Sequence, residues 1–205
     1  IMAPIFSLPR KERANGFSIN IFYVLLIFWL GLTSRISAQN DCECPLSNDL
    51  NRAFSRNMAV GNEDSILWIL DQLKQSPKPS CQQYYLNWKA NLLIAKNQPD
   101  STRKILSQLE RALKDNPCPE NQALCYNALG LYFMGVANLD SATIAYMKEL
   151  EIEKELNHGP TQSVTLVNLA AIFGRMEQYD KSIYYTGKHF QSRWIWRAKI
   201  ESLRF

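Results

Sequence analysis

Apolar residues recur along most of the chain at the spacing of one face of an α-helix, in segments separated by short polar or proline-containing turns. No segment of any length alternates between apolar and polar residues as a strand would. The pattern predicts an all-α protein with helices at residues 48–58, 65–74, 82–96, 100–114, 121–136, 140–156, 162–176 and 180–194. Ser47 and Asp64 are the predicted caps of the first two helices.

Similar residues recur at an interval of 40 along this pattern, which identifies an internal repeat. An aspartate lies at the predicted start of each second helix, where a carboxylate accepts free backbone N–H groups and favours the positive end of the helix dipole. The recurring positions, in order along the unit, are Gln82, Gln122 and Gln162; Ala90, Gly130 and Ala170; Leu93, Phe133 and Phe173; Asp100, Asp140 and Asp180; and Thr102, Ala142 and Ser182.

The second and third units carry the clearest pattern, at Leu129, Gly130, Phe133, Ala142 and Tyr146 and again at Leu169, Ala170, Phe173, Tyr179 and Ser182. It resembles the tetratricopeptide repeat, with the longer interval of the kinesin light chain type. The resemblance implies a right-handed superhelical stack of antiparallel helix hairpins, with units near residues 80–119, 120–159 and 160–191 after a degenerate first unit at 40–79. The first of the three units is the weakest match, since Pro99 stands where the third has Tyr179.

The resemblance also implies a concave groove lined by the first helix of each pair, in which a peptide or protein partner lies. Asn87 and Asn127 occupy equivalent places and are expected to hydrogen-bond an extended backbone; the alternative is that they bond each other or water. Recognition of a C-terminal carboxylate is not expected, because that variant of the family needs several basic residues in the groove. The predicted groove residues are Tyr84, Asn87, Asn91, Ile94, Asn127, Leu131, Met134, Val167, Ala171 and Arg175.

The first 39 residues are typical of a targeting segment, with a basic patch at residues 10–13 and an apolar run at 21–32. A cleaved signal peptide is favoured because the run is shorter than a membrane-spanning helix; the alternative is an uncleaved anchor at residues 14–34. Both place residue 40 onward outside the cytoplasm. The net charge of +4 comes largely from this segment, so it indicates no nucleic-acid partner.

The five cysteines all follow this segment, which suits an oxidising compartment where disulfides persist. They are Cys42, Cys44, Cys81, Cys118 and Cys125. Cys44 or Cys42 is expected to pair with Cys81, because these positions precede first helices that should be neighbours in the stack. Cys118 can pair with Cys125 only if it lies outside its helix and folds back. A metal site is not expected, because the single-residue gap of Cys42 and Cys44 differs from a zinc motif.

No motif of a phosphate-binding loop, a serine nucleophile or a zinc hydrolase occurs, so neither an enzyme nor a cofactor is expected. Glu149, Glu151, Glu153 and Glu155, with Lys148 and Lys154, are predicted to form a solvated outer face. The leading hypothesis is an exported interaction module, similar to the extracytoplasmic sensory region of a bacterial membrane signalling protein. The alternatives are a free-standing exported scaffold or chaperone-like binder, and a secreted enzyme with an unfamiliar site.

Residues 192–205 form a basic aromatic tail in which Trp194 and Trp196 flank an isoleucine. Three interpretations stay open. The tail is a capping helix with its tryptophans packed inward, a surface that touches anionic lipid, or an incomplete remnant of a reading frame that ends or shifts there.

Overall fold

The computed structural model describes residues 42–202, and all secondary structure within that range is helical. The eight helices are α2 (Pro45–Val60), α3 (Glu63–Gln75), α4 (Pro79–Ala95), α5 (Pro99–Asp115), α6 (Pro119–Gly135), α7 (Leu139–Glu155), α8 (Gly159–Arg175) and α9 (Tyr179–Ser202). Among these described helices, none combines the length and the apolar character that a membrane crossing needs. The predicted signal peptide or anchor lies outside the described residues, as do tail residues 203–205.

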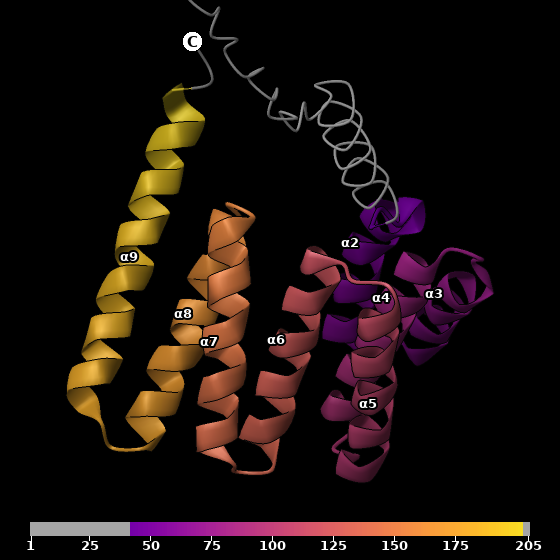
Figure 1. Cartoon of the computed structure of the whole chain (residues 1–205), viewed down its shortest axis with the longest axis horizontal. Coiled ribbons are helices and arrows are strands. Elements are labelled where there is room, and N and C mark those ends of the chain that lie inside the picture. The colour runs from indigo at the N-terminus through magenta and orange to yellow at the C-terminus, as the bar shows by residue number, and fades with distance from the viewer. Residues whose placement is uncertain (1–41, 203–205) are drawn as a thin grey trace, which may run out of the picture. The chain divides into compact units, whose positions relative to one another are not determined.

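The helices pack as four successive antiparallel pairs, and each pair stacks on the next along the chain (Figure 1). The prediction of an all-α stack of helix hairpins is therefore confirmed. The stacking is uneven along the first helices of the pairs. Helix α4 packs directly along α6, whereas α6 and α8 are joined chiefly through α7.

From α4 onward, successive helices begin 20 residues apart and are separated by three-residue connectors. Asn97, Ala137, Asn157 and Glu177 are the middle residues of four connectors and have a positive φ of 51 to 59°. In each case the next amide N–H donates to a carbonyl five residues back, for example Gln98 N to Leu93 O at 3.0 Å. This pattern ends a helix with a left-handed residue and satisfies its last carbonyl groups. The connectors therefore fix where each next helix begins.

Several helices begin earlier than the sequence pattern predicts. Helix α2 begins at Pro45, with Cys44 rather than Ser47 as its N-cap, and α4, α5 and α6 also begin at prolines. Proline suits this place because its φ is already helical and the position needs no N–H donor. Pro99, which weakened the match of the first unit, is thus a helix start.

The observed caps lie two residues before the expected aspartates. In α7 the cap is Asn138, whose side chain accepts a hydrogen bond from Ser141 N, while Asp140 lies inside the first turn. In α3 the cap is Asn62 rather than Asp64. An amide oxygen therefore caps both helices, and the aspartates favour the helix dipole from within the first turn.

Buried side chains form three core clusters, distributed along the stack. The first joins α2, α3 and α4, where Phe54 stacks on Trp88 with ring centroids 4.6 Å apart. The second lies mainly among α4, α5 and α6, around Leu106 and Leu109. The third joins α7, α8 and α9, where Phe173 stacks on Tyr185 at 5.3 Å. Each cluster is built by neighbouring helices, as stacked repeats require.

Helices α6 and α7 approach each other closely at Gly130. A Cβ atom added to this glycine would lie 2.6 Å from the ring of Tyr146, which is fully buried. The equivalent positions in the first unit, 40 residues earlier, hold Ala90 and Leu106. The small residue at 130 is therefore matched to the large ring at 146, and the two positions have to change together.

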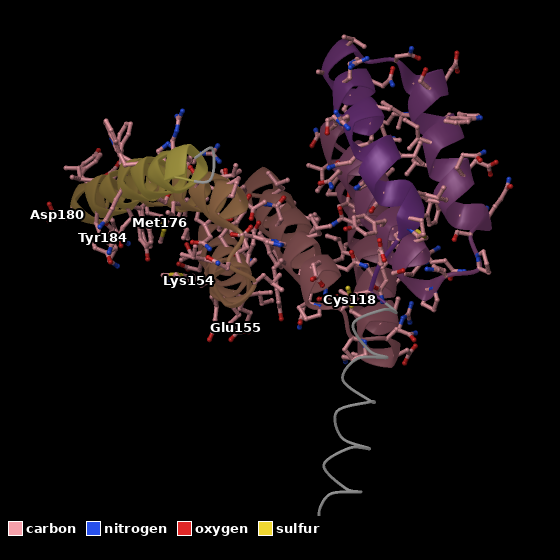
Figure 2. The ribbon with its side chains drawn as sticks, turned by 90° about the horizontal axis from the view of Figure 1, so that it is seen from above. Cys118, Lys154, Glu155, Met176, Asp180 and Tyr184 are labelled. Atoms are coloured by element: carbon pink, nitrogen blue, oxygen red, sulfur yellow. A yellow bond between two sulfur atoms is a disulfide. The ribbon has the colours of Figure 1, made fainter. Side chains whose placement is uncertain are left out.

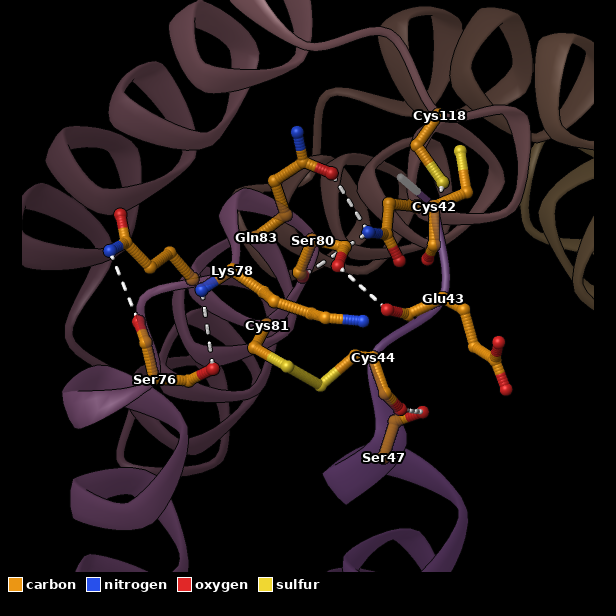
Figure 3. Close-up of a disulfide and its surroundings, with 12 residues drawn as sticks. Cys42, Glu43, Cys44, Ser47, Ser76, Lys78, Ser80, Cys81, Gln83 and Cys118 are labelled. Carbon is orange, nitrogen blue, oxygen red and sulfur yellow. Dashed lines mark hydrogen bonds between the residues drawn. A yellow bond between two sulfur atoms is a disulfide. The ribbon is translucent and has the colours of Figure 1, made fainter. Parts of the chain in front are cut away.

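A disulfide joins Cys44 to Cys81, with Cα atoms 4.9 Å apart (Figure 3). It confirms the expected pairing with Cys81 and ties the residue that precedes α2 to the first turn of α4. The bridge closes a segment with a sequence separation of 37, for which the chain-entropy model gives about 3 to 4 kcal/mol of stabilisation. A bridge of this kind indicates an oxidising compartment.

The last helix, α9, has 24 residues where the five before it have 17. It continues without a break through the start of the predicted tail and ends at Ser202. Trp194 is 69% exposed. The capping interpretation required this tryptophan to pack inward, so it does not hold for Trp194.

We expect Gly130→Ala to lower the free energy of unfolding by about 1 to 3 kcal/mol, because the new methyl group overlaps the Tyr146 ring. Adding Tyr146→Leu should recover part of the loss, since the first unit combines Ala90 with Leu106. Urea denaturation of the three proteins measures both effects.

The matched control is Gly135→Ala at the end of the same helix, where an added Cβ meets nothing within 4 Å. It should leave stability unchanged or raise it by up to about 1 kcal/mol. Equal effects at positions 130 and 135 would contradict the packing argument.

Candidate functional site

The candidate site is the surface formed by one face of α4, α6 and α8, called here the first-helix face. The 40-residue register defines it as four rows of equivalent positions, and the sequence analysis named most of them. The rows are Tyr84, Leu124 and Val164; Asn87, Asn127 and Val167; Asn91, Leu131 and Ala171; and Ile94, Met134 and Arg175, the last row shifted by one residue in α8.

Exposure of this face increases from α4 to α8. Tyr84, Asn91 and Ile94 on α4 are half-buried, and burial raises the pKa of the Tyr84 hydroxyl. On α8, Val164 is 57% exposed, Val167 is 45% exposed, and Arg175 is also exposed. The accessible part of the face is therefore centred on α8 and holds the apolar Val164 and Val167 together with the charged Arg175.

The structure corrects the prediction for Asn87. Its side chain is only 3% exposed, and its Nδ2 donates to the Leu124 carbonyl of α6 at 2.8 Å. Asn91 Nδ2 donates in turn to Asn87 Oδ1 at 3.2 Å. Asn87 thus links α4 to α6 and cannot contact a partner, because a buried amide is retained for the internal carbonyl that it satisfies.

Asn127, the equivalent residue on α6, is half-buried and also bonds inside the protein. Its Nδ2 donates to Glu149 Oε1 on α7 at 2.9 Å. The expected bonds between the asparagines and an extended peptide are therefore replaced by bonds between helices. Removing Asn87 and Asn127 together would test stability rather than partner binding.

The glutamates of α7 do not all belong to a solvated face. Glu149 and Glu153 are 4% and 3% exposed, because their spacing of four places them one turn apart on the inner side of the helix. Thr165 of α8 donates its hydroxyl to Glu153 Oε2 at 2.9 Å. Lys154 and Glu155 lie at the surface, as predicted (Figure 2). The two buried carboxyl groups thus occupy the interior where α6 and α8 meet α7.

Burial raises the pKa of both carboxyl groups. The pKa of Glu149 is raised to about 8. Loss of water contact is the larger cause, and the neighbouring Glu153 carboxylate adds to it. Burial also raises the pKa of Glu153, and its hydrogen bonds from threonine oppose the rise. Tyr146 OH and Glu149 Oε2 are buried without a protein partner. A protonated Glu149 avoids placing an uncompensated charge beside these groups.

Two residues of the first-helix face were missed in the sequence analysis. Leu124 and Val164 are the equivalents of Tyr84 at intervals of 40, so the same register would have found them.

A pocket of about 430 Å³ was also missed, because it lies between α5 and α6 rather than on the first-helix face. Its lining residues are Ser107, Glu110, Arg111, Leu113, Lys114, Gln122, Cys125, Tyr126 and Leu129.

We expect the free energy of unfolding to fall as pH rises from about 4.5 to about 8. The folded state holds the Glu149 proton in this range and the unfolded state does not, so each pH unit costs about 1.4 kcal/mol. Glu149→Gln should flatten this slope and keep the bond from Asn127. Thermal unfolding at a series of pH values measures the pH dependence of stability in both proteins. Glu155→Gln on the exposed side of α7 is the control, and an equal flattening there would refute the assignment.

The chain matches no protein-family model, and no curated protein matches it significantly.

Proposed function

We propose that this chain is an exported interaction module of the tetratricopeptide type, which binds an apolar peptide segment on the α6–α8 part of the first-helix face. The observation that carries the proposal is the exposure of Val164 and Val167 on α8. These valines occupy the rows of Leu124 and Asn127 on α6. Apolar side chains grouped on one face gain free energy when a partner removes them from water.

The bonding of the asparagines restricts the chemistry of the partner. Asn87 is used inside the protein, and Asn127 already donates to Glu149. The face therefore offers few groups that could pair with an extended main chain. An amphipathic helix satisfies its own main chain and presents apolar residues at intervals of three and four, so it suits this face better than an extended peptide.

Export is supported by the Cys44–Cys81 disulfide, because such bridges persist outside the reducing cytoplasm. The exported module is the sensory region of a membrane signalling protein or a free-standing binder. The two alternatives share the same face and differ in what else the full protein contains. The binding experiment below applies to both.

The test is a panel of displayed amphipathic helical peptides selected against the purified chain, followed by measurement of the dissociation constant of an enriched peptide. The double variant Val164→Asp with Val167→Asp should raise the dissociation constant of that peptide by about tenfold or more, because each valine contributes about 1.5 kcal/mol or more on full burial. Both side chains are already exposed, so the fold should be retained.

The matched control is Ile144→Asp with Ile183→Asp, which changes exposed isoleucines on α7 and α9. It should leave the affinity unchanged. Enriched peptides that lose affinity only with this control pair would place binding on the second helices and contradict the proposal.

A further inference from the structure

We propose that Cys42 forms a second disulfide with Cys118, so that residues 42–44 cross-link the beginnings of α2, α4 and α6. This modification site goes beyond the proposed function and shares with it only the oxidising compartment. It also differs from the pairings considered for the sequence, in which Cys118 had only Cys125 as a partner.

The two side chains already lie against each other (Figure 3). Their Sγ atoms and a carboxylate oxygen of Glu120 are all within 4.8 Å of one another. Cys42 Sγ donates to the Pro117 carbonyl at 3.8 Å, and Cys118 Sγ lies 3.9 Å from the Cys42 carbonyl. Cys118 Sγ therefore lies beside the main chain of Cys42, and Cys42 Sγ lies beside the residue that precedes Cys118. The two sulfurs are close enough for a disulfide to form after a small movement.

Both cysteines lie outside regular helix, so their backbones can adjust without breaking helical hydrogen bonds. Cys42 precedes α2 by three residues, and Cys118 is the extended N-cap residue of α6. The surrounding segments are held together independently of the sulfurs. Ser80 Oγ donates to the Glu43 carbonyl at 3.1 Å, and Asn121 Nδ2 donates to the Ser80 carbonyl at 3.3 Å. The two cysteines are therefore held near each other whether or not the bond has formed.

The pairing also accounts for the odd number of cysteines. Cys44 is bonded to Cys81, and Cys118 with Cys42 leaves Cys125 as the single thiol. Cys125 lies on α6 beside the α5–α6 pocket, and burial raises its pKa to about 12. Cys125 is not in the group formed by Cys42, Cys118 and Glu120, so Cys118 is the cysteine placed to pair with Cys42.

The bond forms by thiol–disulfide exchange with a donor disulfide, either a small molecule or a protein. The half-exposed Cys42 attacks the donor as its thiolate, which forms a mixed disulfide and releases one donor thiolate. Cys118 then attacks the Cys42 sulfur and releases the second donor thiolate. Its proton passes to solvent through the Glu120 carboxylate, to which the Cys118 thiol donates at 3.5 Å. The donor is reduced by two electrons as the two cysteines are oxidised.

A zinc ion is the competing occupant of the same cluster. Cys42, Cys118 and Glu120 offer three ligand atoms, whereas structural zinc sites use four protein ligands, mostly cysteine and histidine. The neighbouring Cys44–Cys81 bridge shows that this end of the stack carries an oxidised pair. The disulfide is therefore favoured, and zinc is one outcome of the test.

The experiment uses the full chain, equilibrated with reduced and oxidised glutathione, quenched with acid and digested without reduction. We expect a cross-linked peptide that contains Cys42 and Cys118. After denaturation, the wild-type protein should titrate one thiol, Cys118→Ser should titrate two, and the matched control Cys125→Ser should titrate none.

Three results would overturn the proposal. One is a wild-type chain with three titratable thiols. Another is Cys42 held as a stable adduct with glutathione. The third is one zinc ion per chain that is retained when the protein is loaded with Zn²⁺ and then dialysed against metal-free buffer, and that is absent from Cys118→Ser. None of these readouts depends on peptide binding, so the proposed function can fail without affecting this result.

Discussion

Each helix of this stack can bury its apolar side only against its immediate neighbours, so the starting residue of every helix has to be held in register. The three-residue connectors provide that register from α4 to α9. They place residues such as Ala137 and Glu177 in the left-handed region, which is unfavourable for side chains other than glycine. The chain accepts this strain repeatedly because the hydrogen bonds and the position of the next helix depend on it.

The middle of the stack combines a tight helix contact with a polar interior. Tyr146 fills the space beside Gly130, and one turn further along α7 the interior changes to Glu149 and Glu153. Helices α6 and α8 do not pack along each other as α4 and α6 do, so α7 supplies the groups between them. Asn127 and Thr165 bind the two carboxyl groups from either side. The junction of the second and third units is thus held by specific polar pairs rather than by apolar area alone.

Helix positions, and a disulfide of Cys81 with either Cys44 or Cys42, could be predicted from the sequence because both follow from periodic spacing. The burial of Asn87, Glu149 and Glu153 could not, because periodicity marks polar residues as outward-facing by default. Each of these side chains is buried only because a particular atom on another helix accepts or donates to it. Four helix starts, at Pro45, Pro79, Pro99 and Pro119, were placed one to three residues too late because proline was taken as a break rather than as a first helical residue.

The Cys44–Cys81 bridge has a mechanical consequence. Tension that reaches the chain at Cys44 passes through the two sulfur atoms directly into α4, so α2 and α3 carry little of it. The bridged segment has a sequence separation of 37, which corresponds to roughly 120 Å of extended chain that pulling cannot release. Under load the stack would therefore yield first at a later pair of helices, while the pair nearest the pulled end keeps its shape.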